Sequence, residues 1–177
     1  MKNDMMTARE IIAYMESLQN EEQRRILMGF FKTGPGEYGE GDEFLGLKVP
    51  QTREVVKAVA KEFPLSEVPE LLMNRWHEVR LCGLLVLVAK FERLATKRLE
   101  NDEKAIRGRD EILTMYLKYA EQANNWDLVD LSVHKILGHW LLLPTNLGDP
   151  LLSPCLGGGI SPGRLVGAFY LLRKEIY

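Results

Sequence analysis

Apolar residues recur every three or four positions along most of the first 140 residues, which is the spacing of amphipathic helices. Thr7 and Glu10 form a capping-box pattern that predicts the start of a first helix. Asn20 is the expected cap of a second helix over 21–31, with Ile26, Leu27 and Phe30 as its apolar residues. A glycine-rich and acidic stretch, 33–43, then predicts a loop.

Five further helices are predicted downstream of this loop. The first has Pro50 near its first position, where a missing N–H does no harm, and a second is expected after a Ser66 cap. Residues 76–94 are apolar over such a broad face that they predict a central core helix. The others are expected over 102–120 and, capped by Asn124 or Asn125, over 124–142.

The chain shows no strand-like alternation and no Asn-Gly hairpin signal, so we predict an all-α fold. Val-Ala-Lys occurs within both 55–63 and 84–91, at an offset of 29 residues, which is a faint internal repeat. Helix pairs repeated at this spacing suggest an α-solenoid with a concave binding face. A compact helical bundle is the alternative architecture.

The pattern changes after residue 143. Residues 144–163 hold four Pro and five Gly, which predicts an irregular segment rather than a helix. Residues 164–177 are again helical in pattern. The expected organisation is a helical domain over 1–143, the irregular segment, and a terminal helix that is the remnant of a further repeat.

Composition places the chain among globular proteins and says less about its partner. The 177 residues are 46% hydrophobic and 27% charged, as in one ordinary domain. The net charge of −2 argues mildly against DNA binding, although a local basic groove can lie on a neutral protein. With two cysteines, no signal-peptide core and no apolar run long enough to span a bilayer, we expect a cytoplasmic protein without membrane contact.

The stretch NNWDLVD, 124–130, holds the residues of greatest chemical interest. Trp126 and Asp130 are four residues apart, so they share one side of a helix, which Val133 and Leu137 are predicted to continue. A core Trp beside a surface Asp is the simpler interpretation. An aromatic ring next to a carboxylate is also a good site for a cation. Asp127 is expected to point away from Trp126 and to stabilise the helix dipole.

Other catalytic and binding motifs are missing from the sequence. His77, His134 and His139 lack metal-ligand spacing, and there is neither a phosphate loop nor a nucleophile elbow. We therefore predict no metal and no cofactor. Arg53, Lys57 and Lys61 share one side of their helix, and these and other basic residues either line a groove or solvate outer faces.

Three segments together resemble the DNA alkylation repair family, the AlkD-like DNA glycosylases: GEGDEFLGLKVPQTRE (39–54), WHEVRLCGLLVLV (76–88) and NNWDLVD. The resemblance implies an α-solenoid of HEAT-like repeats with a positively charged concave face. It also implies hydrolysis of the N-glycosidic bond of N3- and N7-alkylated purines in duplex DNA, without a cofactor. We expect a monomer.

The resemblance also implies roles for individual residues. The catalytic Asp and a nearby Trp of the family match Asp130 and Trp126, and a DNA-binding Arg matches Arg164. Several basic residues are expected to border this site, namely Arg53, Lys57, Lys61, Arg80 and Arg164.

The chain departs from the family pattern near its end. Ser161 stands where the family has a Trp, and the family continues for several more helices. We therefore expect a C-terminally truncated solenoid, which a truncated gene or a frameshift near residues 150–165 would produce. The alternative function is a non-catalytic helical-repeat module that binds DNA or protein.

Overall fold

The computed structural model describes residues 6–37 and 39–142, and all regular secondary structure in this part is helical. An isolated bridge between Glu43 and Trp76 is the one extended pairing there. The prediction of an all-α fold is thereby confirmed for these residues, whereas segments 144–163 and 164–177 lie outside them. The α-helices are α1 Ala8–Ser17, α2 Glu21–Phe30, α3 Val49–Val59, α4 Val68–Leu72, α5 His77–Leu94, α6 Glu103–Lys118, α7 Trp126–Val133 and α8 His139–Leu142.

Most helices begin at the residues that local capping chemistry selects. The capping box of Thr7 and Glu10 is formed, and Asn20 accepts a hydrogen bond from the Gln23 amide. Pro50 occupies the first turn of α3. The predicted Ser66 cap is wrong, because residues 65–67 form a short 3-10 turn and α4 begins after it.

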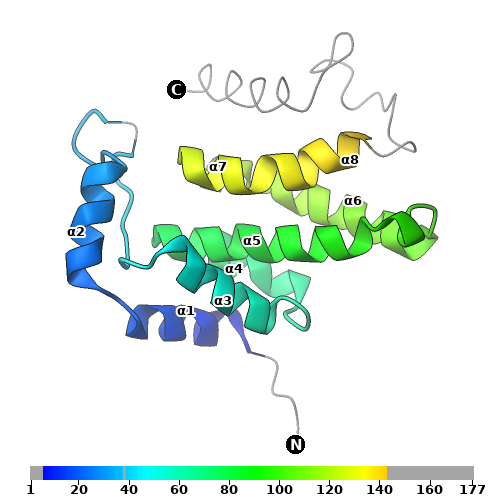
Figure 1. The fold of residues 1–177 in the computed structure, drawn as a ribbon, viewed down its shortest axis with the longest axis horizontal. Coiled ribbons are helices and arrows are strands. Elements are labelled where there is room, and N and C mark those ends of the chain that lie inside the picture. Colours follow the sequence, from blue (N-terminus) through cyan, green and yellow to red (C-terminus); the bar gives the residue numbers. More distant parts are fainter. Residues whose placement is uncertain (1–5, 38, 143–177) are drawn as a thin grey trace, which may run out of the picture.

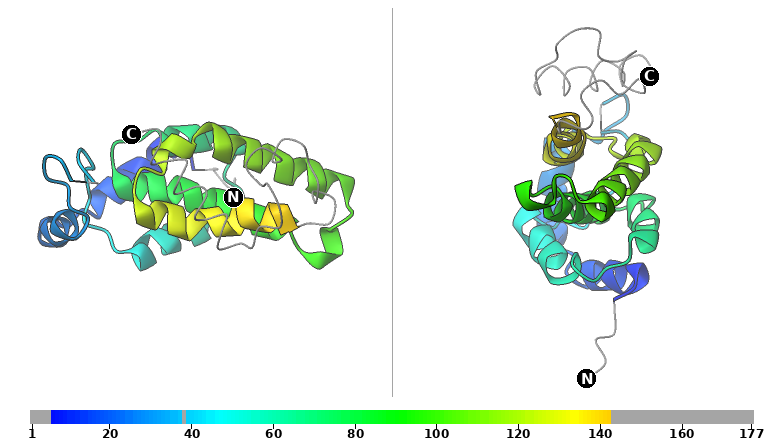
Figure 2. Two further views of the ribbon diagram at one scale, coloured as in Figure 1. Left: turned by 90° about the horizontal axis from the view of Figure 1, so that it is seen from above. Right: turned by 90° about the vertical axis from the view of Figure 1, so that its right-hand side faces the viewer.

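The helices are arranged in successive layers, with α5 in the middle (Figures 1 and 2). Seen end-on, α1 lies at one end of the stack, α3 and α4 follow, then α5 and α6, and α7 lies at the other end. Helix α7 therefore packs on the opposite side of α5 from α3 (Figure 1). A π-helical turn, 134–138, joins α7 to α8 within the stretch predicted as one helix.

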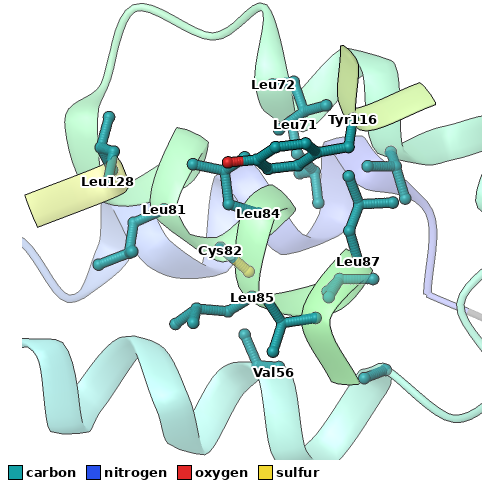
Figure 3. Close-up of a cluster of buried hydrophobic side chains, with 14 of the residues drawn as sticks. Val56, Leu71, Leu72, Leu81, Cys82, Leu84, Leu85, Leu87, Tyr116 and Leu128 are labelled. Carbon is teal, nitrogen blue, oxygen red and sulfur yellow. The ribbon is translucent and has the colours of Figure 1, made fainter. Parts of the chain in front are cut away.

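Helix α5 is buried around nearly its whole circumference, which explains its broad apolar sequence. Its side chains contact Val56 of α3, Leu71 and Leu72 of α4, Tyr116 of α6 and Leu128 of α7 (Figure 3). Even so, no helix in the described part of the chain combines the length and apolar character needed to cross a membrane.

Cys82 lies in this core and is fully buried, as its apolar neighbours predict. Burial raises the pKa of its thiol to about 12. The thiol is therefore a packing group rather than a nucleophile.

Helix α2 differs from the others because none of its residues is buried. Ile26 and Phe30, predicted as its apolar face, are 59% and 60% exposed. The helix stands beside the stack, next to the ends of the layered helices, rather than within it (Figure 1). Its amphipathic pattern predicted the helix correctly but not how deeply it is buried.

The chain after α2 is fixed to α5 by one buried carboxylate. Glu78 accepts hydrogen bonds from the amides of Leu45, Gly46 and Leu47 at 2.8, 2.9 and 3.0 Å. Gly46 adopts φ +85°, and a Cβ there would lie 2.1 Å from the carbonyl oxygen of Asn20. The turn thus requires glycine both for its backbone angle and for space.

Replacing Gly46 with Ala is expected to lower the free energy of unfolding by more than ~2 kcal/mol, because a left-handed backbone angle alone costs about 1–2 kcal/mol and the new methyl group also meets backbone. Gly36→Ala is the matched control, since Gly36 has φ +76° and nothing within 4 Å of its Cβ position. Urea denaturation of both variants measures the difference. Equal effects would show that the contact with Asn20 is unimportant.

Candidate active site

The three segments that carry the family resemblance meet at one place in the fold. Asp42 comes from the loop after α2, His77 and Arg80 from the first turn of α5, and Asp127 from the first turn of α7. Their side chains form a buried cluster that we call the Asp42 cluster; its members are Asp42, His77, Arg80, Asn124, Asn125 and Asp127.

Asp42 is the central acceptor of this cluster. Its Oδ1 accepts hydrogen bonds from Arg80 Nη2 at 2.6 Å and Asn124 Nδ2 at 2.7 Å. Its Oδ2 accepts one from Asn125 Nδ2 at 3.1 Å and lies 3.2 Å from His77 Nδ1. Burial opposes ionisation, but these hydrogen bonds and the Arg80 charge together lower the pKa of Asp42 well below 3.8. Asp42 is therefore a buried, ionised anchor.

His77 lies between two carboxylates. Its Nδ1 faces Asp42, and its Nε2 lies 2.9 Å from Asp127 Oδ2. A neutral imidazole has one N–H, so only the imidazolium can donate to both. Burial disfavours that charge, but the hydrogen bonds and charges of Asp127 and Asp42 raise the pKa of His77 above 6.5. The ring also stacks on Phe44, with centroids 4.5 Å apart, where a cation is favoured.

The cluster should make stability depend on pH. The raised pKa of His77 adds stability that is complete below pH 6.5 and is lost as the pH rises through that raised value. The lowered pKa of Asp42 adds stability above pH 3.8 that is lost as the pH falls through its lowered value. Urea denaturation of wild type and His77→Gln should therefore give free energies of unfolding that converge as the pH rises through the raised pKa of His77. A constant gap at every pH would contradict a protonated His77.

An aromatic group links this cluster to Trp126. The Phe31 ring lies 5.1 Å from the His77 ring and 5.9 Å from the Trp126 ring, centroid to centroid. Phe30 lies 6.1 Å from Trp126. Trp126 is half-buried as a result. Its orientation thus depends on the C-terminal end of α2, where Phe30 and Phe31 lie, as well as on α7.

Asp130 lies one turn after Trp126 on α7, and its side chain is exposed. It forms no ion pair or hydrogen bond with residues 6–37 or 39–142. Val133 and Leu137, predicted to continue this side, are instead buried in the core. The outward side continues with His134, which is exposed.

Asp127 lies in the first turn of α7, as predicted, but only 8% of it is exposed. The start of α7 is covered by α5 and by the loop after α2, so a residue pointing away from Trp126 enters the protein rather than the solvent. Its Oδ2 binds His77, which the sequence prediction overlooked.

The basic residues predicted to border Asp130 are not gathered around it. Arg80 is 5% exposed, and its guanidinium binds Asp42, Asn124 and two backbone carbonyls, so it is a core residue. The exposed residues Arg53, Lys57 and Lys61 belong to α3 and the turn after it, across α5 from α7 (Figure 1). Lys57 and Lys61 pair with neighbouring glutamates. Arg164 lies outside the described residues.

The Asp42 cluster itself was missed by sequence reasoning. Asp42 was noted only within the 33–43 loop and a segment resembling the family, His77 also as a histidine without metal-ligand spacing, and Asn124 also as a candidate helix cap. The available signal was that all three segments place polar residues immediately beside apolar runs. The cluster does not resemble a metal site, because His77 separates the two carboxylates. No group of three or more metal-binding side chains suited to one ion occurs in the described part.

Comparison with known proteins identifies one family. A family model described as DNA alkylation repair enzyme matches residues 11–149, more than half of the chain. The matched range includes every residue of the Asp42 cluster, together with Trp126 and Asp130. Searches of curated proteins and of solved structures each found no significant match.

Proposed function

This chain belongs to the DNA alkylation repair enzyme family, and we propose that it hydrolyses the N-glycosidic bond of N3- and N7-alkylated purines in duplex DNA. The observation that carries the proposal is the exposed Asp130 carboxylate, one helical turn from the half-buried ring of Trp126. This pair is the one part of the NNWDLVD segment that offers chemistry at the surface.

The neighbouring polar residues of that segment are explained by the fold. Asn124 and Asn125 donate hydrogen bonds to Asp42, and Asn125 also accepts one from the Trp126 amide. Asp127 binds His77. Asp130 has no such structural partner among the described residues. A carboxylate held on a rigid helix without a structural partner is well suited to act on a ligand.

The reaction needs only modest help from the protein. Alkylation at N3 or N7 makes the purine cationic and a good leaving group. Cleavage leaves positive charge on the deoxyribose, in an oxocarbenium-like state. Asp130 stabilises that charge and orients the attacking water, and Trp126 packs against the sugar and adds cation–π stabilisation. No general acid is required.

The helix layers support a repeat architecture. The pairs α3–α4 and α5–α6 follow one another in the stack, with α1 before them and α7 after them (Figure 2). We propose that these are HEAT-like repeats and that duplex DNA binds on the α7 side, where Asp130 is exposed. Arg53, Lys57 and Lys61 lie away from that side, so we assign them no direct role there. Arg164 stays a predicted DNA contact.

Release of 7-methylguanine and 3-methyladenine from methylated duplex DNA tests this proposal directly. Wild type is expected to release at least one of these bases, and unmethylated duplex serves as the control substrate. Duplex binding without any release would instead favour a non-catalytic helical-repeat module.

A further inference from the structure

We propose that His77 is a positioning residue: its imidazolium fixes Asp127, and through it the first turn of α7, so that Trp126 and Asp130 are presented in one orientation. The inference rests on the proposed excision reaction, because it assigns His77 a role in supporting the two reacting side chains. His77 itself is 2% exposed and does not reach the surface.

Asp127 has one anchor among the described residues. Its Oδ2 lies 2.9 Å from His77 Nε2. Its Oδ1 is buried without a hydrogen-bond partner among the described residues. A buried carboxylate with one oxygen unsatisfied is stable only while its other oxygen has a strong, charged donor. His77 is that donor, so the seating of Asp127 depends on it.

His77 is itself held by residues from several elements. Asp42, from the loop after α2, faces Nδ1, and Asp127, from α7, faces Nε2. Arg80, on α5 with His77, is the other cation in the cluster and neutralises Asp42 through its 2.6 Å contact. The rings of Phe31 and Phe44 cover the imidazole. Two carboxylates thus face two cations, and loss of the His77 proton would leave one excess negative charge buried.

The pair of His77 and Asp127 is connected to the reacting side chains through α7. Asp127 directly follows Trp126 and precedes Asp130 by three residues, within one helix of eight residues. Phe31 contacts both His77 and Trp126, so a movement of the His77 ring also reaches the Trp126 ring through Phe31. A shift of the first turn of α7 would therefore move Trp126 and Asp130 together.

The test compares wild type with His77→Gln, whose side-chain amide can donate to only one of the two carboxylates at a time. We expect the single-turnover rate of base release to fall by about 10- to 100-fold, the size expected for ~1 Å misplacement, while duplex affinity stays within about threefold. The wild-type rate should also decline as the pH rises through the raised pKa of His77, and that decline should be missing in His77→Gln. Arg109→Gln is the matched control, because Arg109 is equally buried but binds the Leu94, Leu99 and Glu100 carbonyls near the far end of α5. It should lower stability and leave the pH profile unchanged.

A second measurement does not depend on activity. The indole N–H resonance of Trp126, assigned with Trp126→Phe, should shift as the pH rises through the titration of His77 in wild type but not in His77→Gln. If wild type released no base and the resonance still shifted, the positioning would stand and excision would be excluded. An unshifted resonance with an unchanged rate profile would overturn the positioning. If His77→Gln did not fold, Asp127→Asn would replace it: the rate of base release should fall by the same factor, because the link between His77 and α7 is lost.

Discussion

Asp130→Asn is expected to lower the single-turnover rate of base release from methylated duplex DNA by ~10²-fold or more, the usual worth of one preorganised charge-stabilising group. Duplex binding should survive, because removing one acid reduces repulsion from phosphates. Thermal stability should hardly change, since the side chain is exposed and makes no ion pair with the described residues.

The control for this substitution is Asp102→Asn, the same chemical change at another exposed helix position. Asp102 caps α6 by accepting from the Ala105 amide at 2.8 Å, and Asn caps helices about as well as Asp. Its rate should equal that of wild type. If Asp130→Asn released bases as fast as wild type, the Asp130 carboxylate would have no part in the mechanism.

Asp42→Asn is expected to lower the free energy of unfolding by ~3–5 kcal/mol, because breaking a buried ion pair leaves its partner uncompensated. An amide oxygen accepts at one position only, whereas Asp42 satisfies donors on both oxygens. Either Arg80 or His77 would then face an NH₂ group, and neither cation would keep the negative charge of Asp42 beside it. Guanidinium or urea denaturation at pH 6 measures the loss.

Glu43→Gln is the neighbouring control. Glu43 pairs with Arg75 at 3.6 Å, but both side chains are well exposed, at 44% and 63%. Exposed pairs contribute roughly 0–1 kcal/mol, so this variant should remain close to wild type. Similar losses from both substitutions would mean that burial of the Asp42 ion pair does not increase its effect on the free energy of unfolding.

Local chemistry made the helices predictable, because capping and apolar spacing act over a few residues. Thr7, Asn20 and Pro50 each mark a helix start from the sequence alone. Helix geometry likewise placed Trp126 and Asp130 on one side of α7. Helix geometry could not predict what surrounds that side of α7. Val133 lies only slightly around the helix from Trp126, yet it is buried.

The rest of the candidate site depends on contacts between distant segments. His77 meets Asp127 across 50 residues and Asp42 across 35. No local pattern predicts such pairings. The same reason explains the errors with basic residues: spacing puts Arg53 and Lys57 on one side of α3, but only packing shows that α5 separates them from α7. Arg80 was predicted to border the site, but it binds Asp42 and is buried in the core.

The reach of Asp42 along the chain also sets an order of events during synthesis. Its hydrogen bonds to Asn124 and Asn125 span 82 and 83 residues. At translation rates of about 5–20 residues per second, Asp42 is synthesised roughly 4 to 17 s before these partners. During that interval α5 can pack with α3 and α4. His77 and Arg80 in its first turn can face Asp42, but the two asparagines that complete the hydrogen bonds of Asp42 are still missing. The helical core thus forms first, and the surface that holds Trp126 and Asp130 is assembled only when α7 emerges.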